Sequence, residues 1–481
     1  MSFLSFNFAI FIGFGLLIFH LAPARWRPGV LLGLSYAFYL TWSVAHTALL
    51  AGVTWGVYAT ALWIERSRGE KGKRTRMALG VGVLLLLLFA FKSVTWWARL
   101  FFARGAGAGG DLTLLLVLPL GLSYYIFKMV GYLLDVYWET LPAQRDFVLV
   151  ALYGAFFPQI VSGPIQRAES FFEQKEKMES PQPAEFAIGL RRILFGLCKK
   201  ILVADSLGIL VARVHANPAG FSPLELLVGA YCFSMQLYMD FSGVTDIAIG
   251  LGLLFGVRGP ENFDLPFYSS NMQLFWRRWH MSLTTWLTDY LFTPLRMSLR
   301  NLGNLGLCVA IFANMVAIGL WHGFTWTYLA FGVANAIFLT VSALTLRQRN
   351  RFFKQRTRLA QIRAVVAPLL TFHLVVFTHI LFRAESLPFA LKYLKTLVGM
   401  TRGVPALRFS QSALGVSTAA LALCACGFFA ADAIQWAMGR RLWTERFLAM
   451  PPAVRSAFYG LAAAAVLLLF KGTVTFIYAR F

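Results

Sequence analysis

The feature that most constrains this chain is an apolar stretch, residues 302–346, that contains no Lys, Arg, Asp or Glu. An α-helix rises about 1.5 Å per residue and a bilayer core is about 30 Å thick, so the stretch is far too long for one membrane span. Arg296 and Arg300 precede it, and the basic segment Arg347–Arg358 follows it. Because basic flanks mark the cytoplasmic side, both ends face the cytoplasm. We therefore predict an out-and-back helical hairpin that turns at or near His322 and Gly323.

The composition predicts an all-α polytopic membrane protein. Of the 481 residues, 58% are hydrophobic and only 14% are charged, which is more apolar surface than a soluble fold can bury. The net charge of +23 gathers in loops between apolar runs, where it orients helices and meets anionic lipid. We therefore exclude nucleic acid as a partner and expect membrane lipid instead.

The apolar runs predict about ten to thirteen buried helices. The candidate segments are Phe3–Leu21, Gly29–Trp42, His46–Ile64, Met77–Phe91, Leu112–Val136, Phe147–Ile160, Phe186–Val211, Pro223–Phe255, Leu302–Leu320, Phe324–Leu346, Arg363–Phe382, Gln411–Ala437 and Ala453–Phe476. We expect one integral-membrane domain over residues 1–481, with a motif-bearing core at about 150–346 and generic C-terminal helices over 362–481.

The basic loop Glu65–Arg76 predicts the orientation of the chain. This loop should be cytoplasmic, and counting back three spans places the N-terminus outside the cell membrane. The first run, Phe3–Leu21, lacks the basic start and cleavage site of a signal peptide, so we expect it to be retained. Two segments interrupted by Gly and Pro, Gln159–Gln182 and Arg258–Pro266, indicate re-entrant or interfacial pieces.

Two of the seven histidines are candidate functional residues. His280 and His322 each follow a tryptophan and lie near polar residues, and an ionisable group at bilayer depth is a functional candidate by default. The other histidines have structural interpretations: His20 and His46 are interfacial, His215 lies in a loop, and His373 and His379 are satisfied core histidines.

Four charged residues near the histidines are open to two interpretations. Arg277 and Arg278 are either a positive-inside mark or a clamp for an anionic ligand such as a phosphate-bearing acyl donor. Asp240 and Asp246 lie in an apolar stretch, where carboxylates need cationic partners, and these two arginines are the natural ones. Structural ion pairing and catalysis remain equally open for the carboxylates.

A serine-based mechanism has little support in the sequence, whereas a histidine-dependent acyl transfer needs fewer groups. No metal-ligand cluster, glycine-rich phosphate loop or Gly-x-Ser-x-Gly elbow appears, and Cys424 and Cys426 have neither metal spacing nor a nearby histidine. Acyl transfer needs only a base for the acceptor hydroxyl and a group that stabilises the tetrahedral oxyanion.

Several motifs resemble those of the membrane-bound O-acyltransferases, in particular the bacterial branch that contains the alginate O-acetyltransferase membrane subunit, with the D-alanyl transferase of teichoic acid synthesis as a relative. The matching segments are Phe275–Leu283, Gly319–Gly323, Thr325–Thr327, Met1–Leu21, Phe157–Ile165 and Tyr238–Gly243. The resemblance covers about residues 1–332, and it implies a ring of helices around a thin core with the two histidines at its centre.

The resemblance implies roles for individual residues. His322 should be the general base and His280 should assist it, with Trp276, Arg277, Arg278, Asp240, Ser242 and Trp321 as the candidate substrate-binding residues. It also implies a cytoplasmic thioester donor (acetyl-CoA or an acyl carrier protein) with no bound cofactor or metal. The acyl group would pass outward across a bacterial inner membrane to a polysaccharide, directly or through an extracytoplasmic partner acetyltransferase.

Two departures and two rival functions qualify this interpretation. Where members carry Ile-Pro-Leu-Gly-Gly this chain has Thr293–Arg296, and where members often have a third histidine it has Asn335, so assignment to alginate does not follow. A proton-coupled transporter or flippase that uses His280, His322 and Asp240 is the alternative. A scaffold for a partner enzyme is the third possibility.

Overall fold

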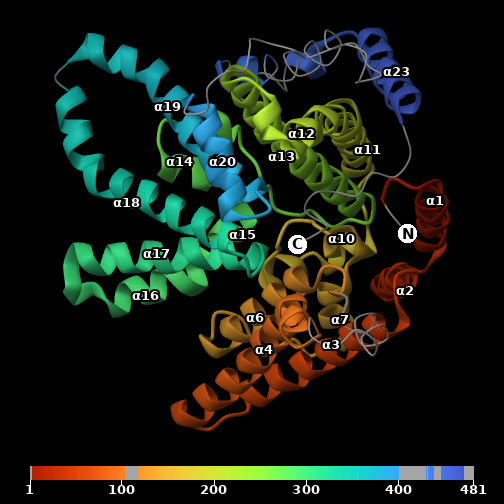
Figure 1. The fold of residues 1–481 in the computed structure, drawn as a ribbon. Coiled ribbons are helices and arrows are strands. Elements are labelled where there is room, and N and C mark those ends of the chain that lie inside the picture. Colours follow the sequence, from red (N-terminus) through yellow and green to blue (C-terminus); the bar gives the residue numbers. More distant parts are fainter. Residues whose placement is uncertain are drawn as a thin grey trace. The chain divides into compact units, whose positions relative to one another are not determined.

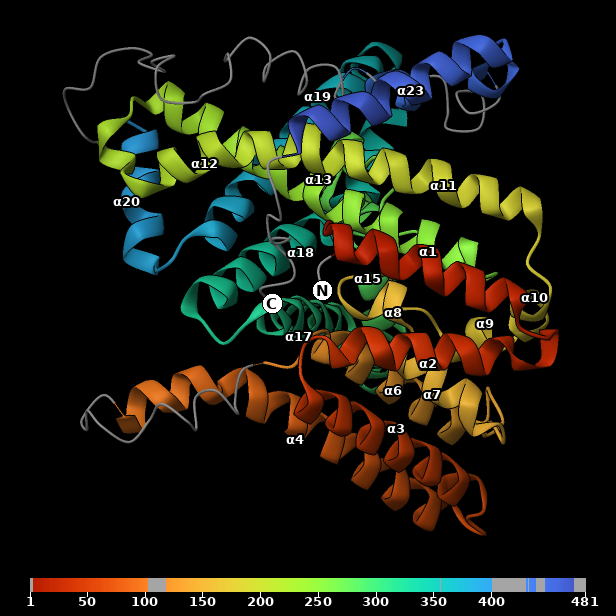
Figure 2. The same ribbon diagram turned by 90° about the vertical axis from the view of Figure 1, so that its right-hand side faces the viewer.

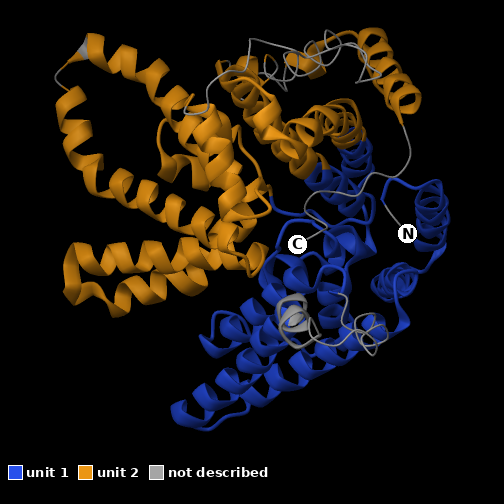
Figure 3. Cartoon of the chain, in the orientation of Figure 1, with its two compact units in different colours: residues 1–193, 244–260, 472–481 blue, residues 194–243, 261–471 orange. Residues whose placement is uncertain are grey.

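The computed structural model describes residues 3–102, 118–354, 356–399, 430, 432–437 and 446–470. Within these ranges the chain is almost entirely helical, and the only strand-like pairing is a single antiparallel bridge between Phe263 and Trp279. The described chain separates into two compact units (Figure 3). Unit 1 comprises the described residues of 1–193 and 244–260, and unit 2 those of 194–243 and 261–471. The predicted all-α class is confirmed, whereas the single domain stays a prediction.

Unit 1 consists mainly of N-terminal helices. They are α1 (Phe6–Leu21), the 3-10 turn η1 (Ala24–Trp26), α2 (Arg27–Leu40), α3 (Val44–Glu65), α4 (Glu70–Phe102), α6 (Leu122–Tyr137), α7 (Phe147–Ala155), α8 (Phe157–Ile160), α9 (Ala168–Phe172), α10 (Lys175–Glu179), most of α11 (Pro183–Leu197) and the end of α13 (Pro223–Leu254). Helices α3 and α4 run side by side as a hairpin in both ribbon views (Figures 1 and 2). The basic loop between them is the one predicted to be cytoplasmic.

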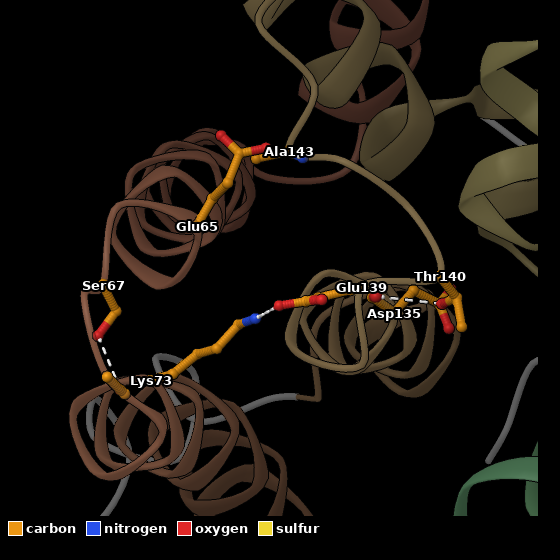
Figure 4. Close-up of polar contacts among 8 residues, drawn as sticks. Glu65, Ser67, Lys73, Asp135, Glu139, Thr140 and Ala143 are labelled. Atoms are coloured by element: carbon orange, nitrogen blue, oxygen red, sulfur yellow. Dashed lines mark hydrogen bonds and ion pairs between the residues drawn. The ribbon is translucent and has the colours of Figure 1, made fainter.

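Polar contacts join the end of α3 and the first turn of α4, on either side of that basic loop, to the connection between α6 and α7 (Figure 4). Lys73 pairs with Glu139 just beyond α6, and Glu65 accepts hydrogen bonds from the backbone N–H of Ala143 and from Arg145. Glu139 and Arg145 are largely exposed, so these pairs add little stability. They show that both connections lie at one end of unit 1. If the basic loop is cytoplasmic, so is the connection after α6.

The first interrupted segment is broken as predicted. Residues 157–182 form only short helices (α8, α9 and α10), and their polar side chains bond inside unit 1. Gln159 Nε2 donates to Gln166 Oε1 at 2.7 Å, and Gln159 Oε1 accepts from Lys128 Nζ at 3.2 Å. All three side chains are buried, so the non-helical backbone here is supported by protein contacts.

Unit 2 contains the histidine motifs and most of the C-terminal helices. Its elements are the π-helix η2 (Cys198–Asp205), α12 (Ser206–Ala216), η3 (Pro218–Gly220), most of α13, η4 (Pro266–Tyr268), α14 (Met272–Arg278), α15 (Met281–Leu287), the π-helix η5 (Thr288–Phe292), α16 (Thr293–Ser298), η6 (Arg300–Leu302), α17 (Gly303–His322), α18 (Trp326–Lys354), α19 (Thr357–Arg383), α20 (Leu387–Leu397) and α23 (Pro452–Leu469). The second interrupted segment, residues 258–266, contains no regular helix before η4.

The predicted hairpin over residues 302–346 is confirmed. Helix α17 ends at His322, α18 begins at Trp326, and the two helices pack along each other (Figure 1). Their backbones come close at Gly319, where an added Cβ would lie 2.4 Å from the carbonyl oxygen of Tyr328 and 3.4 Å from the Cα of Gly332. Small residues at such a crossing let two apolar helices approach closely.

Seven helices of the described chain are long and apolar enough to cross a membrane. They are Val44–Glu65, Glu70–Ser93, Pro223–Leu254, Arg300–His322, Trp326–Lys354, Arg358–Arg383 and Pro452–Leu469. Two shorter apolar segments, Phe6–Leu21 and Phe147–Ile160, match predicted candidates. The candidate Gln411–Ala437 lies mostly outside the described residues, as do the start of Leu112–Val136, the end of Ala453–Phe476 and the two C-terminal cysteines.

The close approach at Gly319 generates a stability prediction. Gly319→Ala forces the hairpin backbones apart, and overpacking of this kind costs about 1–3 kcal/mol, so the Tm of the detergent-solubilised protein should fall. The matched control is Gly56→Ala in α3, where an added Cβ meets nothing within 4 Å. There alanine favours the helix, and the Tm should hold or rise. Equal Tm values for the two variants would contradict the packing argument.

Candidate active site

The turn that presents His280 is held by a loop from elsewhere in unit 2. The backbone N–H of Met281 donates to the carbonyl of Asn262 at 2.9 Å, and the N–H of Ser282 donates to the side-chain oxygen of Asn262 at 3.1 Å. The bridge between Phe263 and Trp279 continues the pairing on the other side of His280. Asn262 is fully buried. It therefore supplies partners for backbone groups that would otherwise be unpaired in an apolar interior.

His280 itself has a left-handed backbone. Its φ is +46° and its ψ is +51°, and it lies at the N-cap of α15. Few residues other than glycine adopt this region, because the Cβ crowds the neighbouring backbone. Such strain persists only where the surroundings hold it, and it concentrates at functional sites. The Asn262 pairing on one side and α15 on the other supply that support.

The indole of Trp321 contacts both predicted catalytic rings. Its centroid lies 5.6 Å from the imidazole of His280 and 4.9 Å from that of His322, in steep edge-to-face arrangements. All three side chains are buried, with exposed fractions of 1% for His280 and 5% each for His322 and Trp321. The structure thus brings together the two histidines that the sequence singled out, although they are far apart along the chain.

Aromatic rings complete the surroundings of both histidines. The edge of Phe241 in α13 meets His280 at a centroid distance of 4.7 Å. Phe382 in α19 lies 4.9 Å from His322, and Tyr328 in α18 lies 6.0 Å from it. None of these three residues was predicted from sequence, because aromatic residues are frequent throughout the chain. They surround the imidazoles with apolar rings and so exclude water.

This environment determines the charge state of His280, which lies outside the seven candidate spans. Burial lowers the pKa of His280 to about 3, because an imidazolium loses its hydration in an apolar interior. The ring is therefore neutral at pH 7 and has one nitrogen that can accept a hydrogen bond and one that can donate.

Two of the predicted substrate-binding residues, Trp276 and Arg278, have polar partners within the protein. The indole N–H of Trp276 donates to the side-chain oxygen of Asn335 at 3.3 Å, so it joins α14 to α18. Arg278 lies 3.8 Å from Asp264, whereas Arg277 is exposed at the end of α14. Ser242 is buried in α13. Ligand binding by these residues stays a prediction.

The partners predicted for the carboxylates of Asp240 and Asp246 were wrong. Asp240 pairs with Lys200 at 2.6 Å, and Asp246 pairs with Arg192 at 2.9 Å. Both cations lie in the predicted helical segment Phe186–Val211, in which no site residue was predicted. Lys200 and Arg192 could have been singled out as charged residues inside an apolar segment. Their partners could not, because the sequence does not show which helices pack together.

The structure corrects two predictions for the remaining histidines, and the interfacial positions of His20 and His46 stay predictions. His379 is buried and shares a 3.0 Å hydrogen bond with Ser234, as expected of a satisfied core histidine. His373 shares a 2.7 Å hydrogen bond with Tyr231, but it is exposed and is therefore not a core histidine. His215 does not lie in a loop. It occupies the last turn of α12 and stacks on Tyr393 at 5.4 Å, because the helix continues to Ala216 before Pro218 can end it.

The left-handed backbone at residue 280 generates a second stability prediction. His280→Gly and His280→Ala both remove the imidazole, but only glycine adopts this φ without steric cost. The glycine variant should therefore be more stable than the alanine variant, by about 1 kcal/mol. Thermal unfolding of the two purified variants measures the difference. An alanine variant that is as stable as the glycine variant would contradict the strained turn.

Comparisons with known proteins identify the family of this chain. The family model described as MBOAT, membrane-bound O-acyltransferase family, matches residues 31–382. A probable alginate O-acetylase AlgI of Pseudomonas putida is 36% identical over 79% of this chain and 75% of its own length. A peptidoglycan O-acetyltransferase of Helicobacter pylori is 30% identical over the same shares of the two chains.

A third relative extends the range of chemistry. A teichoic acid D-alanyltransferase of Bacillus subtilis is 30% identical over 55% of this chain and 69% of its own length. The match to the family model spans the interrupted segments, the turn at His280 and the hairpin that ends at His322. The chain is therefore an integral membrane acyltransferase that belongs to the membrane-bound O-acyltransferase family.

Proposed function

We propose that this enzyme moves an acetyl group from a cytoplasmic thioester donor across the membrane toward a cell-surface polysaccharide, directly or through an extracytoplasmic partner acetyltransferase. The observation that carries the proposal is the contact of two buried histidines with one indole at the end of the α17–α18 hairpin. With the family established, the transporter and scaffold alternatives have no observation in their favour.

In the proposed reaction His322 is the general base. It takes the proton of the acceptor hydroxyl as the hydroxyl oxygen attacks the thioester carbonyl, and a C–O bond forms. The tetrahedral intermediate then collapses, the C–S bond breaks, and the proton passes to the leaving sulfur as a thiol. His280 assists as a neutral ring next to the same indole. The apolar surroundings favour this chemistry because they keep water from competing with the acceptor.

The relatives support the acceptor class but differ in the polymer. Their names carry alginate, peptidoglycan and teichoic acid, so the acceptor here is proposed only as a polysaccharide or cell-wall polymer. Acetyl is the proposed acyl group, because two of the three relatives are named as O-acetylating enzymes. The donor is acetyl-CoA or an acyl carrier protein thioester, and no bound cofactor takes part.

The proposed topology follows the basic loops. The connection Glu65–Arg76 and the segment Arg347–Arg358 would face the cytoplasm, and the N-terminus would lie outside the inner membrane of a bacterium. The hairpin end with His322 is then remote from the cytoplasmic ends of α17 and α18. An outward-facing acceptor would meet the base there.

The proposal predicts that His322 is required for transfer. Membranes that contain His322→Ala should incorporate labelled acetyl into polysaccharide about 100- to 10,000-fold more slowly than wild type, the range for loss of general acid–base catalysis. His280→Ala should also reduce the rate. The matched control is His373→Ala, which removes an exposed histidine of α19 and should leave the rate unchanged.

A folded His322→Ala variant with a wild-type rate would overturn the proposal. Movement of solute or lipid driven by a proton gradient, with no covalent acyl product, would support the transporter alternative instead.

The proposed route also predicts sidedness of the donor. In sealed vesicles, labelled acetyl-CoA should support acetylation only when it is supplied at the cytoplasmic face. Carrier-protein thioester supplied there is the parallel arm, and it identifies the donor if acetyl-CoA alone gives no product. Equal product from either face, in vesicles shown to be sealed, would contradict transfer across the membrane.

A further inference from the structure

A buried ion cluster lies in unit 2 outside the proposed catalytic pair. Lys200 Nζ is 2.6 Å from a carboxylate oxygen of Asp240 and 2.7 Å from one of Asp205. The side chains of Lys200 and Asp240 are each only 1% exposed, and that of Asp205 is 21% exposed. The cluster joins η2 to the middle of α13, two segments that are distant in sequence. The proposed reaction uses none of these residues.

Burial makes this cluster a strong constraint on helix position. A buried charge without its partner is severely destabilising, so Lys200 and Asp240 must stay within hydrogen-bond distance in the folded protein. Lys200 lies on a π-helix, a rare geometry that occurs most often at functional sites. Next to it, an added Cβ at Gly243 of α13 would lie 2.8 Å from the carbonyl of Gly196. The ion pair fixes α13 against η2, and this close contact fixes it against the end of α11.

A neighbouring face of α13 contacts His280, so the position of α13 also affects the position of His280. Asp240 and Gly243 are three residues apart and share the stripe that faces η2. Tyr238 and Phe241 share the neighbouring stripe, and they pack on the loop and turn of the site. Phe241 meets His280 at 4.7 Å, and Tyr238 meets Trp279 at 6.1 Å. Consecutive residues of one helix thus bond to Lys200 and contact the histidine.

We infer that the ion pair between Lys200 and Asp240 is a positioning device for His280. It fixes the rotation and height of α13, so that Phe241 holds the imidazole of His280 against Trp321. Asp240 acts through Phe241 and does not touch the substrate. This inference rests on the proposed function, and it replaces the predicted substrate-binding role of Asp240 with a positioning role.

The test compares Asp240→Asn with a matched ion pair on the same helix. Asp246 of α13 pairs with Arg192 of α11 at 2.9 Å, so Asp246→Asn breaks an ion pair of the same helix that belongs to unit 1. Acetylation is measured in membrane vesicles with labelled acetyl-CoA, per folded enzyme. Asp240→Asn should lower kcat at least tenfold and leave the KM for acetyl-CoA within twofold. Phe241→Leu should show the same pattern, and Asp246→Asn should keep wild-type values.

Substitutions of Lys200 test whether a cation at this position is enough to keep the activity. Lys200→Arg keeps a cation near Asp240 and should retain more kcat than Lys200→Met, whereas a helix-packing role that depends only on side-chain bulk would not separate the two. If Asp240→Asn does not fold, the double variant Lys200→Met with Asp240→Leu replaces the pair by apolar side chains of similar volume. That variant should fold and still have the reduced kcat.

A folded Asp240→Asn or double variant with wild-type kcat would overturn the inference. So would an equal loss of kcat in Asp246→Asn, because the effect would then follow from breaking any ion pair of α13. Activity of His322→Ala is measured in the same assay. If His322→Ala is inactive while Asp240→Asn is fully active, only the positioning role fails; if His322→Ala is active, the proposed function itself fails.

Discussion

The candidate site depends on the pairing between the loop at Asn262 and the turn at His280. A left-handed backbone is unfavourable for histidine, and unpaired backbone N–H groups are costly in an apolar interior. Asn262 stabilises the turn because it accepts hydrogen bonds from the backbone N–H groups of the two residues that follow His280. These hydrogen bonds hold the turn that carries His280, and Phe241 packs on its ring. The contact of His280 with Trp321 therefore rests on backbone hydrogen bonding as well as on side-chain packing.

Other buried polar groups of unit 2 are also paired with residues that are distant in sequence. Lys200 pairs with Asp240, and Ser234 in α13 bonds to His379 in α19. An unpaired polar group would be strongly unfavourable at such depth, so each pair admits only packings in which its two helices meet. These pairs restrict the positions that α13 and α19 can take beside the histidines. This restriction matters for acyl transfer, because small misplacements of a base cost much of its rate.

Much of the helical frame could be predicted from sequence because its causes are local. A run of apolar residues long enough to span a bilayer predicts a helix, and basic flanks predict a turn between two helices. The hairpin that turns at His322 followed from these two rules. The broken segment after Phe157 followed from its glycine and proline residues. His215 was misplaced because Pro218 suggested an earlier helix end than the chain has.

The sequence by itself determined the all-helical membrane class, the two candidate histidines and the family, since periodicity, span length and short motifs are properties of neighbouring residues. Only the tertiary structure decided that Trp321 joins the histidines, that Asn262 holds the turn, and that Asp240 pairs with Lys200 rather than with Arg277 or Arg278. These contacts link residues far apart in the chain. They depend on which helix faces pack together, and the charge or apolarity of a residue alone does not specify its partner.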